Sequence, residues 1–143
     1  MAAIKEIMTP NAETIQSPQT VKEAATRMKE IDTGALPVFD GNKLTGILTD
    51  RDIIVRSLAE SLDPSVTTVG EIMTKDVVTC NENDAVENAA AIMEKNKIRR
   101  LLVKGDSGMI TGIVSLGDVA VNADAQVSGE VLKEVAQPSE PKR

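Results

Sequence analysis

The chain contains one short motif twice, at matching places in its two halves. The motif is a glycine, two aliphatic residues, a hydroxyl residue and an aspartate three positions after the hydroxyl. Its copies are Gly46-Ile47-Leu48-Thr49-Asp50-Arg51-Asp52 and Gly112-Ile113-Val114-Ser115-Leu116-Gly117-Asp118. Each copy ends an apolar run and begins a segment with helical spacing. A hydroxyl, a carboxylate and helix amides then meet at one turn, which is chemistry suited to a ribose phosphate.

The duplication extends over most of the chain. A shift of 65 residues places Glu6-Ile7-Met8-Thr9 on Glu71-Ile72-Met73-Thr74, and a shift of 66 places Gly46 on Gly112. Solenoids generally have shorter periods and at least three units. Two long copies instead predict paired half-domains that bury their apolar faces against each other, at residues 1–62 and 69–121 with a linker at 63–68.

The last part of the chain differs from both copies. Val127, Val131 and Val135 follow one another at four-residue spacing, which predicts a short C-terminal helix within residues 122–136. Residues 137–143 contain two prolines and mixed charges, and we expect a disordered tail there.

Composition limits the chemistry that the chain can perform. Its 143 residues fit one domain with an ordinary core, but aromatic residues make up only 1%, so a bound base would lie between aliphatic side chains. Histidine is absent and there is one cysteine, which removes the usual acid–base group and the usual metal ligands. The sequence contains no phosphate loop, no Gly-x-Gly-x-x-Gly and no Ser/His or Cys/His pair. We therefore expect neither an enzyme nor a metal site.

Charge and targeting signals bound the partners and the location. The formal net charge is -6, which argues against extended nucleic-acid contact. No apolar stretch approaches the roughly 18 residues of a membrane span, and the N-terminus lacks the pattern of a signal peptide. We expect a soluble, cytoplasmic protein with no nucleic-acid or membrane partner.

Apolar spacing predicts the same order of elements in both copies: strand, helix, strand, strand, helix. The expected strands are 12–15, 35–39 and 44–48 in the first copy, and 77–80, 100–103 and 109–114 in the second. The expected helices follow Thr20, Asp50, Asp84 and Leu116. Thr20-Val21-Lys22-Glu23 and Asp84-Ala85-Val86-Glu87 both have the spacing of a capping box.

This order, together with four strings, resembles the cystathionine-β-synthase (CBS) domain pair, or Bateman module, over roughly residues 4–121. The strings are Lys5-Glu6-Ile7-Met8-Thr9, Gly34-Ala35-Leu36-Pro37-Val38, the motif at Gly46 and Ile98-Arg99-Arg100-Leu101. The resemblance implies an α/β (α+β) fold in which two β-α-β-β-α copies pack about a pseudo-twofold axis and form a cleft with two potential nucleotide sites. It also implies a homodimer and a regulatory, energy-sensing role, as in small bacterial proteins that consist of one such pair.

The resemblance places an adenosine-type ligand, such as AMP, ADP, ATP or a related adenosyl compound, at the two motif turns, and no tightly bound cofactor is expected. Asp52 and Asp118 would accept ribose hydroxyls, with Thr49 and Ser115 beside the phosphate. The base would lie near Thr14-Ile15 or Thr79-Cys80 and against the backbone of Ala35-Leu36-Pro37 or Arg100-Leu101-Leu102. Alternatively, each hydroxyl–aspartate pair is only a helix cap, and the strands are only core.

Charges around the two motifs differ, which predicts inequivalent sites. Arg51 stands in the first motif, where the second has Gly117, whereas Arg99 and Arg100 precede the strand of the second copy. These arginines would clamp phosphate, or they are solvated or paired with acids. The turn of Thr49, Arg51 and Asp52 is expected to be the better equipped.

Two functions follow. The first is a ligand sensor that signals in trans to an unidentified effector protein. The second is a constitutive homodimeric adaptor with empty or vestigial sites, in which the aliphatic faces of the helices after Asp50 and Leu116 form the subunit contact.

Overall fold

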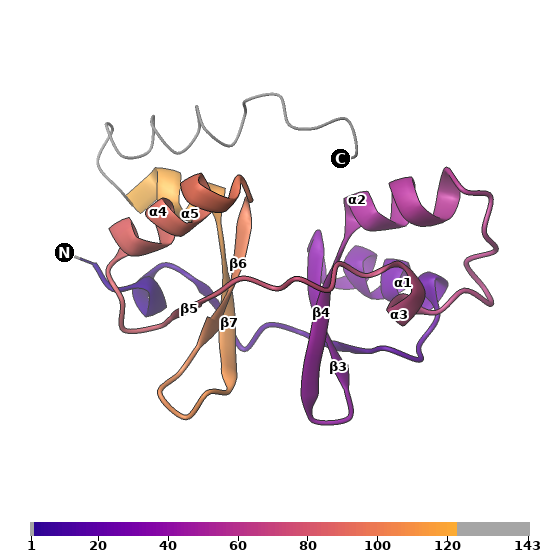
Figure 1. The fold of residues 1–143 in the computed structure, drawn as a ribbon, viewed down its shortest axis with the longest axis horizontal. Helices are drawn as coiled ribbons and strands as arrows, with labels where there is room; N and C mark the ends of the chain where they lie inside the picture. Colours follow the sequence, from indigo (N-terminus) through magenta and orange to yellow (C-terminus); the bar gives the residue numbers. More distant parts are fainter. Residues whose placement is uncertain (1, 123–143) are drawn as a thin grey trace. The chain divides into compact units, whose positions relative to one another are not determined.

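The computed structural model describes residues 2–122 and divides the chain into two compact units. Unit 2 is Ala12–Val77, and unit 1 combines residues before Ala12 with residues from Val78 onward. Each unit contains helices and its own sheet (Figure 1), which confirms the expected α+β class. The C-terminal helix and the tail expected at 123–143 lie outside the described residues.

Unit 2 is built on a three-stranded sheet of order β2-β3-β4. Strand β2 (Ile15–Gln16) runs parallel to β3 (Ala35–Asp40). Strand β4 (Lys43–Thr49) pairs antiparallel with β3, and the two form the hairpin seen in Figure 1. Helix α1 (Val21–Ile31) connects β2 to β3, and α3 (Val69–Ile72) follows later. Helix α2 (Asp50–Ile53) continues directly into a π-helix, η2 (Ile54–Leu58). The helix expected from Asp50 therefore keeps α geometry for only one turn.

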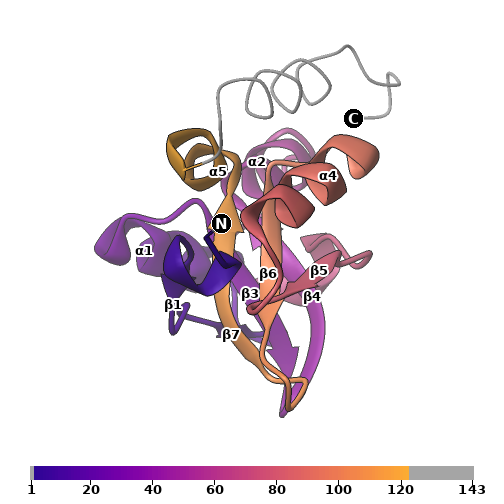
Figure 2. The same cartoon turned by 90° about the vertical axis from the view of Figure 1, so that its left-hand side faces the viewer.

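Unit 1 has a four-stranded sheet of order β1-β7-β6-β5. Its strands are β1 (Thr9–Pro10), β5 (Thr79–Asn81), β6 (Arg100–Lys104) and β7 (Ile110–Ser115). A short 3-10 helix, η1 (Ile4–Glu6), precedes β1, and the α-helices are α4 (Val86–Asn96) and α5 (Leu116–Asn122). Figure 2 shows α4 and α5 close together at the same end of β6 and β7. Within residues 2–122, no helix is both long and apolar enough to cross a bilayer.

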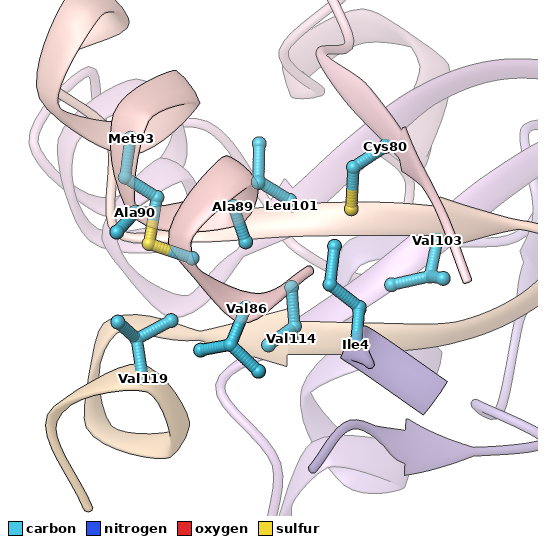
Figure 3. Close-up of a cluster of buried hydrophobic side chains, with 10 residues drawn as sticks. All are labelled: Ile4, Cys80, Val86, Ala89, Ala90, Met93, Leu101, Val103, Val114 and Val119. Atoms are coloured by element: carbon cyan, nitrogen blue, oxygen red, sulfur yellow. The ribbon is translucent and has the colours of Figure 1, made fainter. Parts of the chain in front are cut away.

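Each unit has its own aliphatic core. In unit 2 the buried cluster contains Ile15, Val21, Ala24, Met28, Leu36, Val38, Leu48, Val69 and Ile72. In unit 1 it contains Ile4, Cys80, Val86, Ala89, Ala90, Met93, Leu101, Val103, Val114 and Val119 (Figure 3). No aromatic side chain belongs to either cluster, so both cores depend on close packing of small and branched side chains.

The two long helices begin in different ways. Thr20 caps α1 as predicted, because the Glu23 N–H donates to Thr20 Oγ1 at 3.1 Å and the Thr20 N–H donates to Glu23 Oε1 at 3.1 Å. The hydrogen bond from the Thr20 backbone lowers the pKa of Glu23. The capping box predicted at Asp84 is wrong. The N-cap of α4 is Ala85, and the Asp84 carboxylate accepts from the Asn88 side chain at 2.9 Å instead.

Amides at both helix starts are satisfied by a distant segment. The Val86 N–H donates to Ala2 O at 3.1 Å, and the equivalent Val21 N–H donates to Thr67 O at 2.9 Å. We call residues 2–11 and the equivalent residues 67–76 the opening segments, because each begins one sequence repeat. Each opening segment completes the unit that the rest of the other repeat forms. The compact units are therefore offset from the sequence repeats.

The motif glycines allow the opening segments to lie closely alongside β4 and β7, and we call these two antiparallel contacts the crossings. Thr74 pairs with Ile47 next to Gly46, and Thr9 pairs with Ile113 next to Gly112. A Cβ atom on Gly46 would lie 2.6 Å from Thr74 O, and one on Gly112 would lie 2.5 Å from Thr9 O. These contacts involve backbone atoms, so only glycine fits without displacing the crossing strand.

Substituting either motif glycine with alanine should destabilise the unit that contains it. Gly46→Ala or Gly112→Ala should lower the free energy of unfolding by about 1–3 kcal/mol, the usual cost of overpacking, as measured by urea denaturation. Gly117→Ala is the matched control, because the nearest atom to its Cβ would be Ser115 Oγ at 3.6 Å. In helix α5 this change should be neutral or stabilise by about 0.5–1 kcal/mol. Equal effects at all three glycines would contradict the close crossing.

Cys80 should make the folded protein less stable at high pH. Burial, and secondarily the charge of Asp84, raises the pKa of the Cys80 thiol from 9.0 to about 11. Below pH 9 the thiol is neutral in both folded and unfolded chains. Between pH 9 and 11 only the unfolded chain ionises, and this favours unfolding.

The chain should therefore lose about 1–3 kcal/mol of stability between these pH values on account of Cys80. Comparing urea unfolding of the parent and Cys80→Ala at pH 8 and near pH 11 isolates the effect, since other groups titrate equally in both. A parallel loss in the two proteins would show that Cys80 is not its source.

Candidate functional site

Both motif turns form reciprocal helix caps. In unit 2 the Asp52 N–H donates to Thr49 Oγ1 at 3.1 Å, and the Thr49 N–H donates to Asp52 Oδ2 at 3.0 Å. In unit 1 the Asp118 N–H donates to Ser115 Oγ at 3.1 Å, and the Ser115 N–H donates to Asp118 Oδ2 at 2.9 Å. The capping interpretation of the motif therefore holds at both turns.

The Asp52 carboxylate has further partners within unit 2. Its side chain is nearly buried, and Thr74 Oγ1 donates to Oδ1 at 3.2 Å and to Oδ2 at 3.3 Å. Arg56 Nε lies 3.9 Å from Oδ1. Thr74 belongs to the repeated Glu-Ile-Met-Thr string, which the sequence analysis identified as part of the duplication. No sequence pattern, however, predicted its contact with Asp52. Arg56 carried no signal, because the equivalent residue in the second repeat is Asn122.

The Asp118 carboxylate is less enclosed. Asp118 is half-buried, and among residues 2–122 the Ser115 N–H is the one donor to its carboxylate. Oδ1 therefore retains its capacity to accept hydrogen bonds from a ligand. The expectation from charge alone was that the Asp52 turn is the better equipped. In the structure, however, Asp52 has more protein partners to displace.

The predicted arginines lie at the two turns and form no ion pair with any residue of 2–122. Arg100 is the register partner of Ser115, and the Leu116 N–H donates to Arg99 O at 2.8 Å. Arg51 and Arg99 are exposed and Arg100 is half-buried. Across the described part of the chain, none of the three lies within ion-pair distance of a carboxylate. An anionic group could therefore use them as bidentate donors.

The strands proposed to hold a base are mostly core. Ala35 and Leu36 of β3 are buried, as are Ile15 of β2 and Leu101 of β6. Ile15, Leu36 and Leu101 belong to the core clusters, whereas Ala35 does not. At the core positions a ligand would meet only backbone groups and strand edges. The register nevertheless brings the predicted residues together, because Ala35 pairs with Thr49, Pro37 with Ile47 and Leu101 with Val114.

Thr14 and Thr79, which are also predicted to lie near the base, remain partly exposed. The carbonyl oxygen of Thr14 accepts a hydrogen bond from Arg27 at 3.0 Å, and Thr79 pairs with Leu102 at the start of β5. Cys80 is buried behind Thr79. Within residues 2–122, no group of three His, Cys, Asp or Glu side chains is placed to hold a metal ion.

Comparison with known proteins places this arrangement in a family. The family model for the CBS domain matches residues 4–58 and again residues 69–123. The CBS domain-containing protein YhcV of Bacillus subtilis is 42% identical over 130 residues, which cover 91% of this chain and 89% of that protein.

Solved structures agree with this assignment. The CBS domain pair of protein MJ0100, in complex with 5'-methylthioadenosine and S-adenosyl-L-methionine, has a TM-score of 0.75 and 31% identity, covering 85% of this chain and 94% of that one. CBSX2 in complex with AMP has a TM-score of 0.69 and 26% identity, with coverages of 86% and 96%. The duplicated motif, the paired sheets and these matches agree: the chain belongs to the CBS domain family and carries two tandem CBS domains.

Proposed function

We propose that the chain is a regulatory sensor that binds an adenosyl ligand at its motif turns and passes the signal to a separate effector protein. The observation that carries the proposal is the Asp118 carboxylate, which is accessible on a rigid capped turn next to unpaired Arg99 and Arg100. MJ0100 and CBSX2, which share the fold, support the same ligand class.

The chemistry assigns a role to each group in unit 1. Ribose hydroxyls donate to Asp118, an anionic or polar tail meets Arg99 and Arg100, and the adenine edge meets backbone groups near Thr79 and Leu101. A carboxylate that accepts two ribose hydroxyls distinguishes a nucleoside from inorganic phosphate. In unit 2 the corresponding groups are Asp52 and Thr49 at the turn, Arg51 as the nearby positive charge, and Thr14, Ile15, Ala35, Leu36 and Pro37 beside the base.

The sensing step is a population shift and requires no catalytic group. A ligand changes the equilibrium between two states only by the difference in its affinity for them. AMP, ADP and ATP differ in charge, so arginines next to a ribose-binding turn would respond to the ratio of these nucleotides in the cytoplasm. S-adenosylmethionine carries a positive charge and would be disfavoured by the same arginines.

A ligand panel tests the proposal. AMP, ADP, ATP, NAD and S-adenosylmethionine are titrated by calorimetry and thermal unfolding. A bound ligand at 100 times its dissociation constant should add about 2.7 kcal/mol to the stability of the folded chain. Asp118→Ala should weaken binding by roughly 1.5–3 kcal/mol, the value of a hydrogen bond to a charged group.

Thr26→Ala is a control at an exposed position of α1, in unit 2 and not in the unit that contains Asp118. It should leave ligand binding unchanged. If no compound in the panel binds the parent protein, or if Asp118→Ala binds as the parent does, the sensor proposal is wrong.

A second candidate function is a constitutive homodimeric adaptor, and the exposed aliphatic residues of unit 2 favour it. Ile54 is 57% exposed and Leu58 is 72% exposed on η2, and Val66 after it is 72% exposed. Large apolar side chains gathered at one place on a surface mark interaction sites more often than isolated ones do. A second copy of the chain would bury them in a symmetric contact.

The dimer should depend on these side chains. Leu58→Lys should weaken self-association at least about tenfold, because an unpaired charge would be buried in the contact. Sedimentation velocity of the parent and the variant measures the effect, with Thr26→Lys as the control. A monomeric parent protein, or an unchanged Leu58→Lys dimer, would refute a contact through η2.

A further inference from the structure

The Asp52 carboxylate takes part in two structures of unit 2 at once. It caps α2 through the Thr49 N–H, and it also accepts hydrogen bonds from Thr74 Oγ1 in the opening segment that crosses β4. Arg56 strengthens the second connection. One of its guanidinium nitrogens donates to Met73 O at 3.0 Å and to Ile72 O at 3.3 Å, while Nε lies 3.9 Å from Asp52.

Unit 1 has the same crossing without this connection. Thr9 pairs with Ile113 as Thr74 pairs with Ile47. However, Thr9 is exposed, and among the described residues its hydroxyl makes no hydrogen bond to Asp118. Asn122 replaces Arg56, and its side chain donates to the backbone oxygen of Asp118 at 2.7 Å. Among residues 2–122, the crossing segment of unit 1 is thus joined to its sheet by backbone hydrogen bonds and packing, with no side-chain hydrogen bond to Asp118.

We propose that Thr74 and Arg56 are positioning residues that form a latch on Asp52, and that this latch makes the two ligand sites unequal. The latch is the set of contacts that join Asp52 and Arg56 to residues 72–74. A ribose whose hydroxyls donate to the Asp52 carboxylate competes with the Thr74 hydroxyl for the same oxygens. The Asp118 turn binds first, and the Asp52 turn binds only at higher ligand concentration.

The latch also gives the second binding event a different consequence. Residues 72–74 lead to Val77, where the chain passes from unit 2 into unit 1. Ligand at Asp52 releases side-chain contacts on this stretch, whereas ligand at Asp118 leaves the opening segment 2–11 held as before. This part of the inference rests on the proposed function. The latch itself is a property of the ligand-free protein.

Hydrogen exchange of the ligand-free protein tests the latch directly. The Ile47 N–H donates to Thr74 O and the Thr74 N–H donates to Ile47 O, both at 2.9 Å, and these amides report the crossing. Thr74→Val should make them exchange about tenfold faster, the effect of losing a hydrogen bond to a charged group. Thr9→Val is the matched control, and the Asn11 N–H, which donates to Thr111 O at 2.9 Å, should exchange at the parent rate.

Arg56→Gln is a second variant, chosen because Arg56 is exposed and its loss should leave the core of unit 2 intact. It should also accelerate exchange at Ile47 and Thr74. If exchange at these amides is the same in Thr74→Val, Arg56→Gln and the parent, the latch is wrong, whether or not any ligand binds.

Ligand titration then separates the latch from the proposed function. In an Asp118→Ala background only the Asp52 turn remains, and Thr74→Val should raise its affinity for AMP about tenfold, while Thr9→Val should not change it. Accelerated exchange without binding of AMP or S-adenosylmethionine to the parent would retain the latch and refute the sensor. Binding that Thr74→Val does not strengthen would refute the role of the latch in setting affinity.

Discussion

The close approach of two backbones at Gly46 and Gly112 is the constraint on which the other features of each unit depend. A Cβ atom on these glycines would lie 2.6 Å from a carbonyl oxygen in unit 2 and 2.5 Å from one in unit 1. This approach places an opening segment alongside β4 in unit 2 and alongside β7 in unit 1. The same segment then supplies the carbonyl oxygens that satisfy Val21 and Val86 at the helix starts. In unit 2 it also carries the hydroxyl that reaches Asp52.

Much of the fold could be predicted, because apolar periodicity and turn residues are local signals. The helix Val21–Ile31 and the hairpins of β3-β4 and β6-β7 agree with their expected ranges to within one or two residues. The exchange of opening segments could not be predicted. Glu6-Ile7-Met8-Thr9 and Glu71-Ile72-Met73-Thr74 are identical, so the sequence fits either sheet equally well. The capping box at Asp84 was predicted wrongly because the N-cap of α4 is Ala85, one residue later, and the Asp84 carboxylate accepts from Asn88 instead.

The residues of the candidate site could be predicted from the sequence, but which of the two aspartates is more available to a ligand could not. Periodicity and the repeat located both hydroxyl–aspartate pairs, and the structure shows that each closes a cap. Charge counting favoured the turn with Arg51. Whether a carboxylate is available to a ligand depends instead on side chains that reach it from elsewhere in the fold, here Thr74 and Arg56. The π-helical turn in which Arg56 lies also carries no recognisable pattern in the sequence.

A few substitutions between the two repeats give the two motif turns different surroundings, and under the proposed function these would give two unequal sites. The caps have the same geometry within about a tenth of an ångström, so their intrinsic chemistry is nearly equal. Arg56 donates to the backbone of the crossing segment, at Met73 O, whereas Asn122 at the equivalent position donates to the backbone of its own helix, at Asp118 O. A bond to a charged group is worth roughly 1.5–3 kcal/mol, about a tenfold to hundredfold difference in affinity. In the proposed sensor, such a difference would let one chain respond over a wider range of ligand concentration than two equal sites would.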